Sequence, residues 1–166
     1  PAIAICPGAE FGPAKRWPEH HFAAVANHFL TQGWQVWLLG GERDRTVAQK
    51  IIENCLEPKH CVDLTGRTSI DEAIDLLAHA SAAVSNDSGL MHVAAATGTP
   101  VVGIFGASSE HHTPPLGPMA ATVSLSLSCR PCFARHCPLG HKQCLETLEP
   151  DRVIASLSAL LEKPSQ

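Results

Sequence analysis

Short apolar runs rich in β-branched residues alternate along this chain with longer stretches of helical period. This alternation is typical of βαβ units, in which each strand is followed by a helix that crosses back over a parallel sheet. We therefore predict an α/β fold with a Rossmann-like, doubly wound parallel sheet. The predicted strands are 2–6, 35–39, 61–64, 82–85, 100–105 and 122–127.

The predicted helices carry apolar side chains at three- and four-residue steps. The clearest one runs from Pro18 to Gln32, because Pro18 suits the first helical position and Gly33 suits the position after the last turn. Ser69 and Glu72 have the spacing of a capping box at the start of a helix over 70–77. The remaining helices are predicted at 47–55, 89–97 and 150–161.

The strand predicted at 122–127 differs from the other five. Its apolar residues alternate with Thr and Ser, so one face is expected to meet water and the strand to lie at an edge of the sheet. The other five strands are expected to be buried on both faces.

Composition limits the class of protein further. A length of 166 residues suits one domain, and 45% hydrophobic with 17% charged residues excludes disordered, collagenous and coiled-coil chains. The net charge of -4 gives no basic surface for nucleic acid. No apolar run reaches the roughly 20 residues of a membrane span. We expect a soluble domain without an export signal. Because Pro1 leads directly into a strand, we also expect this domain to be a piece excised from a longer protein.

The loop after the first strand, 7–17, contains Gly8 and ends on two adjacent cations, Lys15 and Arg16. Exposed N–H groups, a helix dipole and a lysine favour an anion, so this loop is predicted to bind phosphate. The alternative is a surface loop with solvated charges. No G-x-x-x-x-G-K-[ST] or G-x-G-x-x-G motif is present, which argues against an ordinary P-loop or NAD enzyme.

The strand 82–85 leads almost directly into a helix through a short polar loop. Asp87 is predicted to be the N-cap, while Ser88 and Gly89 offer backbone N–H groups to a phosphate. His92 falls on the first turn, where it can reach the same oxygens or a sugar. The alternative is that Asp87 only caps the helix and His92 only packs.

Two further loops follow predicted strands. Glu42 and Asp44 lie in a tight turn after the second strand, where nucleoside-binding domains hold ribose hydroxyls, although solvated helix-start acids are the alternative. The polar loop 106–115 contains His111 and His112 without the spaced carboxylate or Cys that a metal site needs. We assign this loop to the substrate side.

Two of these segments together resemble a known family. Residues 6–18 (CPGAEFGPAKRWP) and 86–96 (NDSGLMHVAAA) are similar to the bacterial ADP-heptose:lipopolysaccharide heptosyltransferases, and the long first loop is most similar to heptosyltransferase II. The resemblance covers nearly the whole chain. It implies that residues 1–166 form the C-terminal, nucleotide-sugar-binding domain of a two-domain GT-B glycosyltransferase, and that the N-terminal acceptor domain is absent from this chain.

The resemblance also implies an activity. Family members transfer L-glycero-D-manno-heptose from ADP-heptose to the inner core of lipopolysaccharide, with inversion at the anomeric carbon and without a metal or other cofactor. The acceptor site and the catalytic base are implied to lie in the missing half, so the isolated fragment is expected to be inactive. The resemblance therefore implies a cytoplasmic location. Contact with the inner face of the inner membrane is compatible with it.

Carried over residue by residue, the resemblance assigns roles within this chain. Lys15 corresponds to a pyrophosphate-binding lysine that stabilises charge on the departing ADP. Asp44 or Glu42 is implied to hold the adenosine ribose. The family motif D-[ST]-G-x-x-H, in which backbone N–H groups hold the β-phosphate while Asp and His contact the donor, matches Asp87, Ser88, Gly89 and His92.

Seven cysteines leave one unpaired in any disulfide framework. Cys6, Cys55 and Cys61 lie in or beside apolar segments and are expected to pack as small hydrophobes. The other four could bind zinc, form two disulfides or remain free, and similar Cys-rich inserts occur in only some family members. These four are Cys129, Cys132, Cys137 and Cys144, with His136 and His141 among them.

Two other functions remain open from the residues alone. A phosphate-binding loop does not specify the base or the sugar, so another GT-B transferase with a different nucleotide sugar fits the same loops. A non-catalytic nucleotide- or zinc-binding module fits if the cysteine cluster is the main feature. Nucleotide selectivity and metal content distinguish these alternatives.

Overall fold

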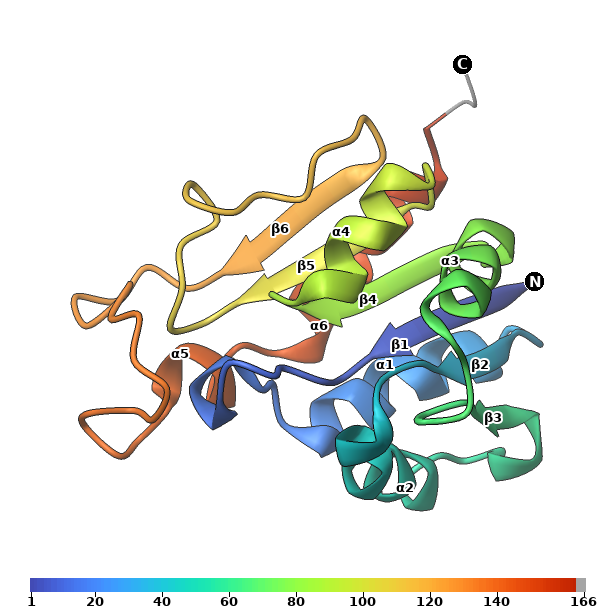
Figure 1. The fold of residues 1–166 in the computed structure, drawn as a ribbon, viewed down its shortest axis with the longest axis horizontal. Coiled ribbons are helices and arrows are strands. Elements are labelled where there is room, and N and C mark those ends of the chain that lie inside the picture. The colour runs from blue at the N-terminus through green and yellow to red at the C-terminus, as the bar shows by residue number, and fades with distance from the viewer. Residues whose placement is uncertain (164–166) are drawn as a thin grey trace.

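The computed structural model describes residues 1–163, and these form a single six-stranded sheet with helices on both faces (Figure 1). All neighbouring strands run parallel, in the order β3-β2-β1-β4-β5-β6. This is the doubly wound order, so the predicted fold class is confirmed. The strands are β1 Ala2–Cys6, β2 Gln35–Leu38, β3 Cys61–Asp63, β4 Ala82–Asn86, β5 Val101–Phe105 and β6 Ala120–Ser124.

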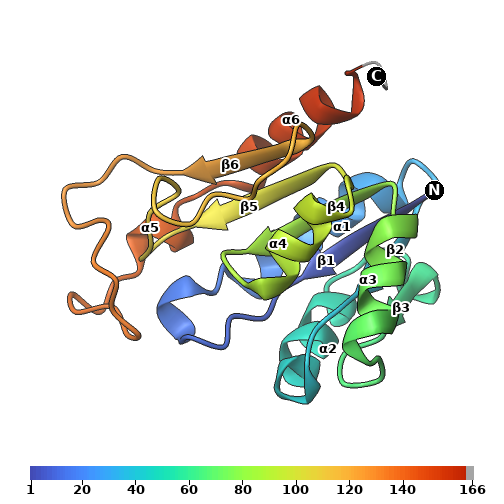
Figure 2. The same cartoon turned by 45° about the horizontal axis from the view of Figure 1, so that its top comes forward.

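The helices cover the two faces of the sheet in two groups (Figure 2). One buried cluster joins the sheet to α1, α2 and α6, and a second joins it to α3 and α4. Among residues 1–163, no helix combines the length and the apolar character that a membrane span requires. The helices are α1 Glu19–Leu30, α2 Arg45–Glu53, α3 Ile70–His79, α4 Gly89–Ala96, α5 Gln143–Glu146 and α6 Pro150–Leu161.

Strand β1 shows how the sequence builds both cores at once. Successive side chains of a strand point to opposite faces, so Ile3 and Ile5 pack into the cluster with α1 and α6. Ala4 and Cys6 enter the cluster with α3 and α4. Every residue of β1 is buried, as its continuous apolar run predicts.

Three predictions about the elements need correction. The last strand spans 120–124 instead of 122–127, because its ladder follows β5 from Val101 to Phe105 and ends where β5 ends. Its predicted edge position is confirmed. Strand β3 was expected to be buried on both faces, but it forms the opposite edge and leaves Val62 41% exposed. The short helix α5 was not predicted.

Arg130 ties the loop after β5 to the segment after β6. Its guanidinium donates to the backbone oxygens of Gly106, Leu125 and Ser108, each at 3.0 Å, and to Glu110 Oε2 at 2.7 Å. Burial tends to raise the pKa of Glu110, but hydrogen bonds from Arg130 and Ser124 outweigh it and lower the pKa to about 2. Glu110 therefore stays charged in the folded protein at pH values well below the ordinary pKa of a glutamate.

We expect Glu110→Gln to remove part of the acid sensitivity of folding. A lowered folded-state pKa gives stability that is complete above the ordinary value of 4.5 and lost as the pH falls towards about 2. The substitution should destabilise the protein at pH 7 by about 1 kcal/mol after allowance for solvent screening. It should also flatten the dependence of unfolding free energy on pH between 4.5 and 3.

Urea denaturation at several pH values measures both effects. The control is Glu162→Gln, which changes an exposed carboxylate at the end of α6. An unchanged slope in Glu110→Gln would show that the Arg130 contacts do not hold this carboxylate charged.

Candidate functional site

The predicted loops meet at the carboxyl ends of β1 and β4, which are hydrogen-bonded neighbours. The helices after these two strands, α1 and α4, lie on opposite faces of the sheet. This is the point where the strand order reverses, and open α/β sheets bind ligands in the crevice there. The loop after β1, residues 7–18, lies against the loop that joins β4 to α4.

Asn86, at the end of β4, fixes both ends of the loop after β1. Its Nδ2 donates to the backbone oxygen of Pro7 at 2.7 Å, and its Oδ1 accepts from the backbone N–H of Trp17 at 3.0 Å. Asn86 is fully buried. Because two backbone groups far from β4 in sequence would otherwise lack partners, this amide determines where the loop lies.

Trp17 secures the end of the same loop. The indole is 1% exposed and packs edge to face on Phe22, and its Nε1 donates to the backbone oxygen of Leu148 at 2.9 Å. The loop is thus attached both to β4 and to the segment that leads into α6. Lys15, two residues earlier, is held in place by these attachments.

Lys15 and Asp87 form a short ion pair between the two loops. Lys15 Nζ lies 2.6 Å from Asp87 Oδ2, and their side chains are 17% and 5% exposed. Ser108 Oγ donates to the same carboxylate oxygen at 2.6 Å, and Thr113 Oγ1 lies 3.5 Å from the other. The ring of Phe11 lies on another side of the ammonium, 5.0 Å from Nζ.

The prediction that Asp87 caps α4 is wrong. Ser88 is the N-cap residue, and no side chain accepts a hydrogen bond from the first turn. The carboxylate of Asp87 instead binds Lys15 and Ser108, since a buried charge needs a counter-charge more than a neutral capping contact. The first N–H groups of α4 consequently have no side-chain acceptor.

Arg16 and Ser88, the chain neighbours of Lys15 and Asp87, line a cavity of about 580 Å³, a size typical of small-molecule sites, whereas Lys15 and Asp87 themselves do not line it. Gly8, Asp44, Ser88 and Gly89, four of the predicted binding residues, line it together. A Cβ on Gly89 would meet nothing within 4 Å, so a ligand can approach its backbone closely. Other lining residues are Cys6, Ala9, Glu10, Arg16, Gly40, Gly41, Glu42, Arg43, Ile70, Leu90 and Val93.

Asp44 serves the structure and also faces this cavity. Its Oδ2 accepts from the backbone N–H of Gly41 at 2.9 Å, as the helix-start alternative predicted. A Cβ on Gly8 would collide with the Asp44 carboxylate, so any side chain there would force this carboxylate to move. Burial raises the pKa of the Cys6 thiol to about 12, and the charge of Asp44 adds to this, so Cys6 packs as a neutral group.

His92 and Glu42 lie apart from these contacts. His92 is exposed on the first turn of α4 and is not among the residues that line the cavity, so its predicted contact with the donor stays a prediction. Glu42 lines the cavity but pairs with Arg45 at 2.9 Å in exposed surroundings.

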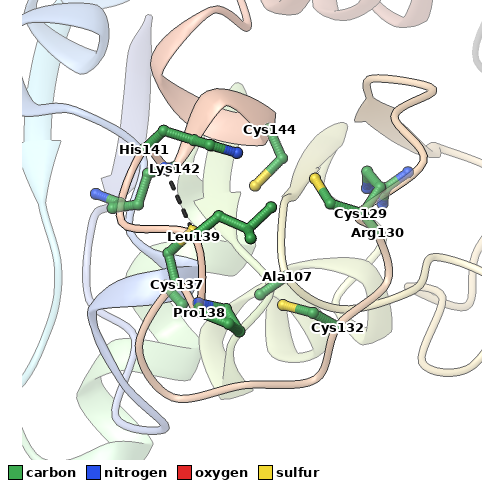
Figure 3. A pocket seen from close by; sticks show the side chains of 11 residues that line it. Ala107, Cys129, Arg130, Cys132, Cys137, Pro138, Leu139, His141, Lys142 and Cys144 are labelled. Atoms are coloured by element: carbon green, nitrogen blue, oxygen red, sulfur yellow. Dashed lines mark hydrogen bonds between the residues drawn. The ribbon is translucent and has the colours of Figure 1, made fainter.

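The four clustered cysteines surround a separate cavity of about 180 Å³ (Figure 3). All four are free thiols, so the disulfide alternative is not realised. Among residues 1–163, no three His, Cys, Asp or Glu side chains lie close enough together to hold a metal ion. The backbone N–H of Lys142, 3.4 Å from Cys137 Sγ, lowers the pKa of that thiol.

The sequence reasoning missed three residues of this site. Asn86, Trp17 and Ser108 had no assigned role, although their side chains hold the loops and the ion pair. A polar residue at the end of an otherwise apolar strand, as at Asn86, is a signal that could have indicated a buried hydrogen bond.

Comparison with known proteins agrees with this geometry. Residues 1–143 match glycosyltransferase family 9 (heptosyltransferase). The chain belongs to glycosyltransferase family 9. The resemblance stated from the two loop segments is therefore confirmed.

Individual family 9 members are similar over almost the whole chain. Lipopolysaccharide heptosyltransferase 2 of Escherichia coli is 42% identical over 97% of this chain, and lipooligosaccharide heptosyltransferase 2 of Haemophilus influenzae is 40% identical over 98%. These matches cover 47% and 48% of the relatives, so this chain spans about half their length.

Solved structures of the family superpose well on this chain. The E. coli ADP-heptose lipopolysaccharide heptosyltransferase II matches with a TM-score of 0.86 and 42% identity, over 97% of this chain and 46% of that one. A family 9 glycosyltransferase of Veillonella parvula matches with a TM-score of 0.82 and 25% identity, over 96% and 45%. These two structures therefore share the fold of this chain.

We expect Asn86→Ala to destabilise the protein by roughly 2–4 kcal/mol, because it leaves two backbone groups unpaired in the interior. Asn27→Ala is the matched control, since Asn27 also bonds two backbone groups, the oxygen of Asn54 and the N–H of Leu56, but near solvent. The control should cost about 1 kcal/mol. Urea denaturation measures both values, and equal losses would contradict the role given to Asn86.

Proposed function

We propose that residues 1–166 are the donor-binding domain of an inverting heptosyltransferase. The enzyme would transfer heptose from ADP-L-glycero-D-manno-heptose to the inner core of lipopolysaccharide. The observation that carries this proposal is the cavity lined by Gly8, Asp44, Ser88 and Gly89, with the Lys15–Asp87 pair beside it. Two relatives at about 40% identity are heptosyltransferases 2, and one similar structure is that of the E. coli ADP-heptose lipopolysaccharide heptosyltransferase II.

The diphosphate of the donor would lie at the first turn of α4. The backbone N–H groups of Ser88 and Gly89 and the positive end of the helix dipole suit a phosphate there. The open space at Gly89 supports this position. The adenosine would fill the cavity, with the ribose hydroxyls at Asp44.

Lys15 would stabilise the charge that develops on ADP as the glycosidic bond breaks. An ammonium has three N–H donors and Asp87 takes one, so the others remain for phosphate oxygens. A fixed cation that meets growing negative charge lowers the barrier more than it strengthens ground-state binding. In this role Asp87 positions Lys15, and His92 contacts the sugar from the exposed first turn of α4.

The acceptor-binding site and the catalytic base would be supplied by an N-terminal acceptor domain. Fixed cations and a helix N-terminus would do the charge stabilisation that a metal ion performs in other transferases, so no cofactor is proposed. The proposed location is the cytoplasm, at the inner face of the inner membrane, where the lipopolysaccharide acceptor would be met.

Calorimetric titration of this chain with ADP, UDP and GDP tests the donor assignment. We expect ADP to bind at least tenfold more tightly than the other two, because an adenosine site is proposed. Preference for UDP or GDP would favour a transferase that uses another nucleotide sugar. No binding of any nucleotide would overturn the proposal.

We expect Lys15→Ala in the complete enzyme to lower kcat by about 100-fold or more, with a smaller effect on KM, because its contact strengthens in the transition state. Lys59→Ala is the control, since Lys59 is exposed and pairs only with Glu57. Steady-state kinetics with ADP-heptose measures both. A Lys15→Ala enzyme with unchanged kcat would refute the role of Lys15.

A further inference from the structure

Arg16 occupies a fixed place between two anchored residues. Lys15 before it is paired with Asp87, and the backbone N–H of Trp17 after it is bound by Asn86. The backbone of Arg16 is extended, with φ of -93° and ψ of 115°, so neighbouring side chains point in different directions. Lys15 reaches the ion pair, whereas Arg16 lines the 580 Å³ cavity together with Ser88 and Gly89. Arg16 also lines a second cavity, with Glu19 and Glu146, but pairs with neither carboxylate.

The guanidinium of Arg16 has no counter-ion among the described residues. Its Nε is buried without a hydrogen-bond acceptor, and none of the six ion pairs within residues 1–163 includes Arg16. A cation that is partly withdrawn from water and lacks an internal partner gains strongly from an anionic ligand.

The carboxylates that share the cavity have other contacts or lie in water. Glu42 pairs with Arg45, and Asp44 accepts from the backbone of Gly41. Glu10 is exposed. Arg43 also lines the cavity, but its side chain is exposed to solvent and so gains less from an anion than Arg16 does.

Lys15 and Arg16 therefore differ in the charge that they can offer. The charge of Lys15 is shared with Asp87 at 2.6 Å, so the pair is close to neutral as a unit. No carboxylate among residues 1–163 neutralises Arg16 in this way. A diphosphate carries at least two negative charges and needs more compensation than Lys15 and backbone N–H groups provide.

We propose that Arg16 is a second phosphate-binding residue, whose guanidinium holds the diphosphate of the nucleotide in this cavity. It supplies the net positive charge for binding, while Lys15, held by Asp87, supplies a positioned donor for the reaction. This inference rests on the proposed nucleotide site. It predicts that Arg16 contributes chiefly to ground-state affinity and that its contribution depends on phosphate.

Calorimetric titrations with ADP and adenosine test this inference on the chain as it stands. We expect Arg16→Gln to weaken ADP binding about tenfold and adenosine binding less than twofold, because adenosine has no phosphate. Arg16→Lys keeps the charge and should recover part of the ADP affinity. Arg152→Gln is the control, since Arg152 is exposed on α6 and does not line this cavity, and it should change ADP binding less than twofold.

Each outcome has a defined meaning. If ADP and adenosine binding weaken equally in Arg16→Gln, Arg16 has a structural role and the inference is wrong. If wild-type protein binds ADP and Arg16→Gln binds it equally well, only this inference fails. Absence of ADP binding by the wild type would remove the proposed function itself. Thermal unfolding of each variant confirms that it is folded before titration.

Discussion

The site depends on one buried side chain, the amide of Asn86. It bonds the backbone oxygen of Pro7 and the backbone N–H of Trp17, so both ends of a long loop are attached to the central strand β4. A loop of this length would otherwise sample many conformations, and ordering it costs entropy. Because the attachment is buried, water does not compete for it. The positions of Lys15 and Arg16 follow from this constraint.

The positive charge at the site cannot be inferred from the net charge of the chain. The chain carries a net charge of -4, yet Lys15 and Arg16 stand beside the first turn of α4. Asp87 pairs with Lys15 at 2.6 Å and so fixes the position of its ammonium. Arg16 has no counter-ion among residues 1–163. In the proposed site, Lys15 would therefore act as a positioned donor and Arg16 would attract the phosphates.

Much of the fold could be predicted from the sequence, because hydrophobic periodicity is a local signal. The continuous apolar run of β1 and the capping box at Ser69 both have the structures that they indicate. Strand boundaries at the edges were less accurate, since the end of β6 is decided by its partner β5. Val62 was misjudged because an edge position depends on strand order, which no single strand encodes.

Several residues of the candidate site could be predicted from the sequence, but the contacts between them could not. Gly8, Asp44, Ser88 and Gly89 do line one cavity, but the partner of Asp87 is Lys15, 72 residues away in sequence. Such long-range pairing follows from the tertiary fold and not from local pattern. The capping role expected for Asp87 fails for this reason.

We propose that the loop after β1 and the first turn of α4 together hold a diphosphate. A crystal structure of this chain with ADP tests it most directly. We expect phosphate oxygens about 2.7–3.2 Å from Lys15 Nζ, from the Arg16 guanidinium and from the backbone N–H of Ser88 or Gly89. ADP bound elsewhere, or bound here with its phosphates turned to solvent, would contradict it.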